Sequence, residues 1–205
     1  MVHVYTGDGK GKTTAAVGLA VRSAGYGKKT LIIQFMKGQG TGELAACRLL
    51  SGLIDIEQFG REEFYVPEKP EAKSETKSET KSGTISGIKI SPLAADGKNF
   101  EISSDKALFI RDAEAGLSRA ADALSRGNYD ILILDEALNL IRLGLIDEAR
   151  LLELISMHKN GYTEIVITGR GATEAVIAAA DIVTEMRMVK HCFESGAGAR
   201  EGIDY

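Results

Sequence analysis

The sequence predicts an α/β fold in which parallel strands are joined by crossover helices. Short apolar runs alternate along the chain with longer segments whose apolar residues recur at helical spacing. A glycine-rich stretch, residues 7–14, separates the first apolar run from the first helical segment. With 205 residues, the chain is long enough for one such domain with a full hydrophobic core. We therefore expect one domain over residues 1–205.

Six segments are predicted to be strands. Each is short, rich in apolar or β-branched residues, and bounded by glycine or polar residues. They cover residues 2–5, 30–36, 54–59, 131–134, 164–168 and 182–185. Because helical segments lie between them, we expect a mainly parallel sheet of about six strands.

Five segments are predicted to be helices. In residues 105–124 the apolar side chains fall at spacings that line one helix face. The five segments are residues 13–24, about 43–50, 105–124, 147–157 and 173–180.

Residues 67–83 interrupt this alternation. They contain two Ser-Glu-Thr-Lys repeats at 74–81 and almost no apolar side chain. Such a segment cannot offset its own ordering entropy, so we expect a mobile surface loop within a polar insertion at about 67–98. Two interpretations are open: a solvated insertion, or a lid over a site, with Ile85, Ile88 and Ile90 forming a small hairpin.

Composition excludes several classes of function. The net charge is −4, which disfavours nucleic-acid binding because no excess of basic residues is present to replace phosphate counterions. The two cysteines, Cys47 and Cys192, show no metal-ligand spacing and are typical of a reducing compartment. No apolar run reaches the roughly 18–20 residues needed to cross a bilayer, and the N-terminus lacks a signal-peptide pattern. We therefore expect a cytoplasmic protein that binds neither membrane nor nucleic acid.

The glycine-rich stretch predicts a phosphate-binding loop. Its residues are Gly7, Asp8, Gly9, Lys10, Gly11, Lys12, Thr13 and Thr14. The standard pattern has four residues between the first glycine and the Gly-Lys-[Ser/Thr] ending, whereas here three residues separate Gly7 from Gly11. Backbone N–H groups of such a loop and the positive end of the next helix attract one anion. We expect all eight residues to bind ATP, with Lys12 on the phosphates and the Thr13 hydroxyl on Mg²⁺.

Polar residues at the ends of later strands extend this predicted site. Asp135 and Glu136 follow the apolar run 131–134, and carboxyl ends of parallel strands face the ligand in such sheets. One of these carboxylates is expected to hold Mg²⁺ opposite Thr13, the alternative for Asp135 being a helix N-cap. Arg170 follows another strand, where its donors suit phosphate oxygens, although an isolated surface arginine is equally compatible.

Two further residues are candidates for the site. Arg22, on the first helix, is a candidate ATP ligand that faces either the site or solvent. His191 is only a weak candidate acid or base, because a lone histidine is more often structural. No nucleophile, histidine and acid occur at spacings typical of covalent hydrolysis.

Taken together, these motifs resemble the P-loop ATP:corrinoid adenosyltransferases. The resemblance covers nearly the whole chain outside about residues 61–104. The matching segments are residues 7–14, 34–38 with 42–43, 134–136, 168–170, 180–186, 189–191 and 202–205. The resemblance implies a RecA-like parallel sheet with helices on both faces, and a homodimer. It also implies transfer of the 5′-deoxyadenosyl group of ATP to Co(I) of a reduced corrinoid, with loss of triphosphate.

The resemblance also implies roles for single residues. Co(I) is itself a strong nucleophile, so the expected catalytic residues, Lys12, Arg170 and Glu136, act on the leaving triphosphate. Mg²⁺ is expected on Thr13 and Glu136. The family places its nucleotide in the loop in the opposite sense to other P-loop enzymes, which agrees with a shortened loop.

The corrinoid side of the predicted site is less defined. Phe64 and Tyr65 are the nearest candidates for corrinoid contacts, with core packing as the alternative. A flavoprotein-type reductant is compatible with the family's need for Co(I).

Two other functions compete with this interpretation. One is a P-loop ATPase or kinase that cleaves the γ-phosphate, with Glu136 orienting the attacking group. The other is a non-catalytic corrinoid-delivery protein that uses ATP as a conformational ligand. The shortened loop and the lack of an evident acceptor site disfavour the first. The second is disfavoured by the presence of Lys12, Thr13, Glu136 and Arg170.

Overall fold

The computed structural model describes residues 1–67, 84–85, 88–89, 102–158, 162–190, 200 and 202–203. Its main sheet has six strands, all parallel, in the order β10-β1-β9-β8-β2-β3. The strands are β1 (Val2–Thr6), β2 (Thr30–Phe35), β3 (Ile54–Phe59), β8 (Ile131–Asp135), β9 (Glu164–Thr168) and β10 (Ile182–Glu185). The six predicted strands are thereby confirmed.

Helices cover both faces of this sheet, as predicted for a RecA-like α/β fold. Five of them lie close to the predicted segments: α1 (Lys12–Ala24), α2 (Gly42–Leu49), α3 (Lys106–Arg126), α5 (Glu148–His158) and α6 (Glu174–Ala179). The sixth, α4 (Ala137–Arg142), was not predicted, because six residues directly after a strand are too short to display a helical period. None of the helices in the described ranges is long and apolar enough to cross a bilayer.

Within the described ranges, four short strands lie outside the main sheet. β4 (Phe64–Tyr65) pairs with β7 (Ile102–Ser103) in parallel. β5 (Thr84–Ile85) and β6 (Ile88–Lys89) pair antiparallel, which confirms the expected hairpin at Ile85 and Ile88. Ile90 and the remainder of the predicted 67–98 insertion, apart from Pro67, lie outside the described residues.

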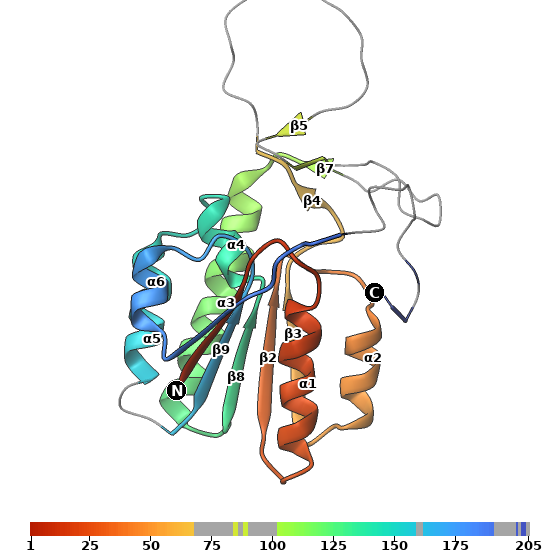
Figure 1. Cartoon of the computed structure of the whole chain (residues 1–205), viewed down its shortest axis with the longest axis vertical. Coiled ribbons are helices and arrows are strands. Elements are labelled where there is room, and N and C mark those ends of the chain that lie inside the picture. Colours follow the sequence, from red (N-terminus) through yellow and green to blue (C-terminus); the bar gives the residue numbers. More distant parts are fainter. Residues whose placement is uncertain are drawn as a thin grey trace, which may run out of the picture.

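The direction of each crossover decides which face its helix covers. From β1 to β2 to β3 the chain moves one way across the sheet, and from β3 through β8 and β9 to β10 it moves the other way. Since such crossovers are right-handed, the two directions place helices on opposite faces. Figure 1 shows this result: α1 and α2 lie on one side of the sheet, and α5 and α6 on the other.

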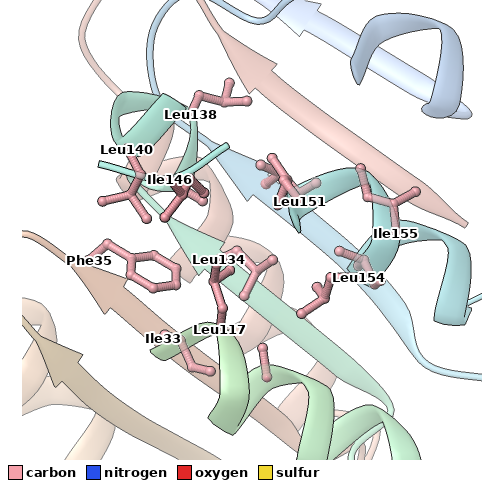
Figure 2. Close-up of a cluster of buried hydrophobic side chains, with 14 of the residues drawn as sticks. Ile33, Phe35, Leu117, Leu134, Leu138, Leu140, Ile146, Leu151, Leu154 and Ile155 are labelled. Atoms are coloured by element: carbon pink, nitrogen blue, oxygen red, sulfur yellow. The ribbon is translucent and has the colours of Figure 1, made fainter. Parts of the chain in front are cut away.

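The core follows the two-residue period of the strands. Along β8, Ile131 and Ile133 pack beneath α1, whereas Leu132 and Leu134 pack on the opposite face. Figure 2 shows the larger of the two cores, in which Phe35 and Leu134 meet side chains from α3, α4 and α5. Apolar side chains therefore cover both faces of the sheet, and the polar residues lie at the carboxyl ends of its strands.

Glycine at one position of α3 is a packing requirement. A Cβ atom added at Gly116 would lie 2.4 Å from Cε1 of Phe35 and 3.1 Å from Cγ of Phe59. Phe35 is fully buried, so its ring has little room to move. Gly18, in the middle of α1, has no atom within 4 Å of the corresponding position.

This difference predicts opposite effects for one substitution. Gly18→Ala should raise the free energy of unfolding by up to about 1 kcal/mol, because alanine favours a helix over glycine. Gly116→Ala should instead lower it by about 1–3 kcal/mol, because the methyl group overpacks the contact with Phe35. Urea unfolding measures both variants, and an increase in stability for Gly116→Ala would show that α3 does not pack on Phe35 this closely.

Candidate active site

The glycine-rich loop joins β1 to α1 at the carboxyl edge of the sheet (Figure 1). Gly7 and Gly11 have φ angles of 96° and 110°, in the left-handed region that glycine tolerates best. Lys12, only 7% exposed, is the first residue of α1, and its Nζ donates to the carbonyl oxygens of Gly7 and Gly9, each at 2.7 Å. Burial, followed by the positive charge of Arg170, lowers the pKa of Lys12. The loop is thus folded around a buried amine.

A backbone segment after β10 holds the loop from the other side. The N–H of Gly9 donates to the carbonyl oxygen of Met186 at 2.6 Å, and the N–H of Met186 donates to the carbonyl oxygen of Thr6 at 2.8 Å. A Cβ atom at Gly7 or Gly9 would lie 2.5 or 2.6 Å from that same Met186 oxygen. These glycines therefore also permit the close approach of Met186, a role that the sequence pattern did not indicate.

The carboxylate of Asp135 is the centre of the site's hydrogen bonds. It is 1% exposed and accepts four donors. Thr13 and Thr168 donate their hydroxyls to Oδ1 at 2.8 and 2.7 Å, while Gln34 and Lys37 reach Oδ2 at 3.1 and 2.9 Å. The N-cap of α4 is Glu136, so Asp135 does not have the alternative role of a helix N-cap.

Glu136 lies beside this network in a strained conformation. Its φ is 64°, which is uncommon for a residue other than glycine. Its N–H donates to the hydroxyl of Thr168 at 2.9 Å, and Asn139 Nδ2 donates to its carboxylate. Burial, and then the neighbouring charge of Asp135, raises the pKa of Glu136. Of the two adjacent carboxylates, Asp135 and not Glu136 is the hydrogen-bond partner of the Thr13 hydroxyl in this structure.

Arg170 is brought to the loop, as predicted. Its Nη1 lies 3.3 Å from Oδ1 of Asp8, and its backbone N–H donates to Oδ1 of Asn139 at 3.0 Å. Its side chain is 44% exposed, so its donors are accessible from outside. Asn139 contacts both Glu136 and Arg170, and it therefore couples the ends of β8 and β9.

The remaining candidates for the ATP side of the site lie in the loop, on α1 and near the C-terminus. Lys10 Nζ donates to the carbonyl oxygen of Ile203 at 2.9 Å, and Thr14 is an exposed residue of α1. Arg22 is exposed in the last turn of α1, about 15 Å along the helix axis from Lys12, and lies away from the loop of its own chain. His191 lies outside the described residues.

Tyr65 packs against the core. Its ring lies 5.1 Å from that of Phe109, centroid to centroid, in a tilted arrangement. This contact is the packing role that was the alternative to a corrinoid contact. Phe64 is placed by its backbone in β4, and its side chain is outside the described part of the chain.

Sequence reasoning assigned no role to Gln34, Lys37, Asn139 or Thr168, although three of them lie in the motifs that carried the family resemblance. A signal was present for Gln34 and Thr168, because a polar side chain within an otherwise apolar strand end is unusual unless it is bonded. Asn139 lies on the short helix that the sequence pattern did not reveal.

Comparison with known proteins gives a consistent result. The family model described as ATP:corrinoid adenosyltransferase BtuR/CobO/CobP matches residues 1–91 and 85–205. A corrinoid adenosyltransferase from Pseudomonas aeruginosa is 30% identical, over 98% of this chain and 82% of that protein. One from Salmonella typhimurium is 28% identical, over 100% of this chain and 85% of that protein.

These matches span both ends of the chain and include the loop, the two carboxylates and Arg170. The predicted resemblance is therefore confirmed, and the chain belongs to the ATP:corrinoid adenosyltransferase family, a family of transferases.

Proposed function

We propose that this site carries out the adenosylation of its family by transferring the 5′-deoxyadenosyl group of ATP to Co(I) of a reduced corrinoid. The observation that carries the proposal is the convergence of Lys12, Arg170 and the Thr13–Asp135 pair on one glycine-rich loop. These residues are suited to stabilising a polyanionic leaving group. In the transfer, the bond between C5′ and the triphosphate oxygen breaks, its electron pair leaves with the triphosphate, and a cobalt–carbon bond forms.

The loop and Lys12 are proposed to bind the triphosphate. Lys12 Nζ now donates to two neutral carbonyl oxygens of the loop. Anionic phosphate oxygens are stronger acceptors, and their charge favours the protonated amine that burial disfavours. We therefore infer that Lys12 shifts its hydrogen bonds to the triphosphate and stabilises the negative charge that develops as C5′ is attacked.

Arg170 is proposed to act on the same leaving group from its position beside Asp8. The Asp8 carboxylate holds its guanidinium beside the loop at 3.3 Å. This pair is largely exposed, so its strength in water is modest and a triphosphate can replace it. The planar donors of arginine then bind two phosphate oxygens at once.

The same residues fit a magnesium ion. The Thr13 hydroxyl and the carboxylates of Asp135 and Glu136 are hard oxygen donors, and Mg²⁺ takes one or two protein ligands together with water and phosphate oxygens. We propose that Thr13 and Glu136 hold the ion and that Asp135 orients Thr13. When bound, Mg²⁺ supplies neutralising charge on the departing triphosphate.

We also propose the wider setting of the reaction. The chain acts as a single cytoplasmic domain and forms a homodimer, and a flavoprotein-type reductant supplies Co(I). The corrinoid is expected over the carboxyl edge of the sheet near β4, because ATP and corrinoid must share that edge for C5′ to reach cobalt.

The first prediction concerns the products. Incubation of the protein with ATP, Mg²⁺ and a chemically reduced corrinoid should give inorganic triphosphate and a light-sensitive adenosylated corrinoid in equal amounts. Phosphate analysis and absorbance spectra before and after illumination measure both. ADP and phosphate formed without corrinoid would instead identify an ATPase, and ATP binding without turnover would identify a delivery protein.

The second prediction concerns the residues around the loop. Lys12→Ala and Glu136→Ala should each lower the adenosylation rate on the order of 10²-fold or more, because each removes charge stabilisation at the leaving group or its metal. Lys28→Ala, at an exposed lysine beyond the far end of α1, is the matched control and should leave the rate unchanged. Activity near the wild-type rate in both site variants would remove these assignments.

The third prediction follows from the raised pKa of Glu136. Burial favours its neutral form in the folded state, so folding stability is fully present below the ordinary pKa of 4.5 and is lost as pH rises through the higher folded pKa. Glu136→Gln keeps an acceptor for Asn139 and removes the charge. The variant should therefore melt at a higher temperature than wild type at pH 7 and at the same temperature below pH 4.5.

Thermal melts across this pH range measure the difference, with the exposed Glu174→Gln as control. A constant difference between Glu136→Gln and wild type at all pH values would show that charge burial is not its cause. Loss of adenosylation together with gain of stability would mark Glu136 as a residue retained for function.

A further inference from the structure

A cleft lies at the carboxyl edge of the sheet, beside β3 and α3. It has a volume of about 280 Å³. It is lined by Gln58 and Phe59 of β3, Gly60 and Arg61 of the following loop, and Asp112 and Ala115 of α3. None of these residues belongs to the ATP site described above, so the cleft requires a separate explanation.

Hydrogen-bonded side chains on three neighbouring strands connect the cleft to the active site. Gln58, Gln34 and Asp135 are register partners on the neighbouring strands β3, β2 and β8. Gln58 Nε2 donates to Gln34 Oε1 at 3.1 Å, and Gln34 Nε2 donates to Asp135 Oδ2 at 3.1 Å. Two strand spacings of about 4.8 Å therefore place Gln58 about 10 Å from the carboxylate that contacts Thr13.

The rim of the cleft is held by close backbone packing. A Cβ atom at Gly60 would lie 2.4 Å from the backbone nitrogen of Lys37, and one at Gly38 would lie 2.5 Å from the carbonyl carbon of Arg61. Gln39 Nε2 also donates to the carbonyl oxygen of Glu62 at 3.1 Å. The two loops that follow β2 and β3 are thus fixed against each other, and the cleft is preformed.

The charges in the cleft select for a neutral polar ligand. Arg61 Nε lies 2.9 Å from Asp112 Oδ2, and both side chains keep some exposure, 27% and 19%. Arg111 Nη2 also lies 3.6 Å from Asp112 Oδ1, but its side chain is 69% exposed and does not line the cleft, so water and salt screen its charge. An anion that binds Arg61 must overcome the charge of Asp112, and a cation that binds Asp112 must overcome that of Arg61. A primary amide avoids both costs, because its carbonyl accepts from the guanidinium while its NH₂ donates to the carboxylate.

Resting on the proposed function, we propose that this cleft binds a peripheral carboxamide side chain of the corrinoid. Corrinoids carry several such amides around the ring, and the cleft lies at the carboxyl edge of the sheet, the edge proposed above for the meeting of cobalt and C5′. Gln58 Nε2 already donates to Gln34 Oε1 and to the carbonyl oxygen of Gln39, so Gln58 supplies its Oε1 as a further acceptor. Phe59 and Ala115 contact the methylene groups of the side chain. The cleft thereby fixes the rotation of the corrinoid relative to ATP.

Filling the cleft tests this proposal. Ala115→Leu should weaken binding of hydroxocobalamin on the order of tenfold, because the larger side chain excludes the amide, and should leave ATP affinity unchanged. Ala107→Leu, at another exposed alanine of α3 that does not line the cleft, is the matched control. Equal hydroxocobalamin affinity in the two variants would overturn the proposal.

A charge test does not depend on steric exclusion. Among the cobalamin derivatives in which one peripheral amide is hydrolysed to a carboxylate, at least one should bind wild type on the order of tenfold more weakly than hydroxocobalamin, because Asp112 repels it. Asp112→Asn should restore most of that affinity, whereas the control Asp122→Asn should not. If no derivative is discriminated, or if Asp122→Asn restores binding equally, the cleft does not bind an amide.

Both measurements are equilibrium titrations of Co(III) corrinoids followed by absorbance, and they require no turnover. Failure of the proposed transferase function would be seen instead in the product analysis of the wild-type protein with Co(I). A wild-type protein that transfers the adenosyl group and discriminates none of these ligands would therefore reject the cleft alone.

Discussion

The buried carboxylate of Asp135 is the constraint on which the rest of the site depends. A charge with 1% exposure is costly unless it is fully bonded, and its four donors come from α1, β9, β2 and the loop after β2. Each donor must reach one point, so the ends of these elements cannot shift independently. The positions of Thr13 and Lys37 beside the glycine-rich loop follow from this single group.

The shortened loop gains its shape from the sheet as well as from its own sequence. One of its N–H groups, that of Gly9, is bonded to Met186 in this structure, and the same Met186 is bonded to the end of β1. Edge strand β10 therefore holds the loop through backbone contacts that no side-chain motif reveals. A loop with one residue fewer has fewer N–H groups to direct at an anion, and we propose that its lysines and Arg170 supply a larger share of the stabilising charge.

The fold was predictable because its signals are local. Six apolar runs and five amphipathic segments predicted six strands and five helices, and parallel pairing followed from their alternation. The glycine loop, Glu136 and Arg170 could be named as candidates because each lies at a strand end. The contacts of Met186, Asn139 and Gln58 were not predictable, because they depend on which strands are neighbours. The strand order is decided by crossover direction, and a single sequence does not display it.

Strain is concentrated where the chemistry is expected. Met36 and Glu136 are the non-glycine residues with positive φ among those the structure describes, at 58° and 64°, and each costs about 1–3 kcal/mol. They directly follow β2 and β8, which are neighbours in the sheet. The turn at Met36 precedes Lys37, which bonds Asp135, and the turn at Glu136 follows that carboxylate. Two strained turns thus flank one buried charge, and the sealed cores on both faces of the sheet supply the stability that keeps them in place.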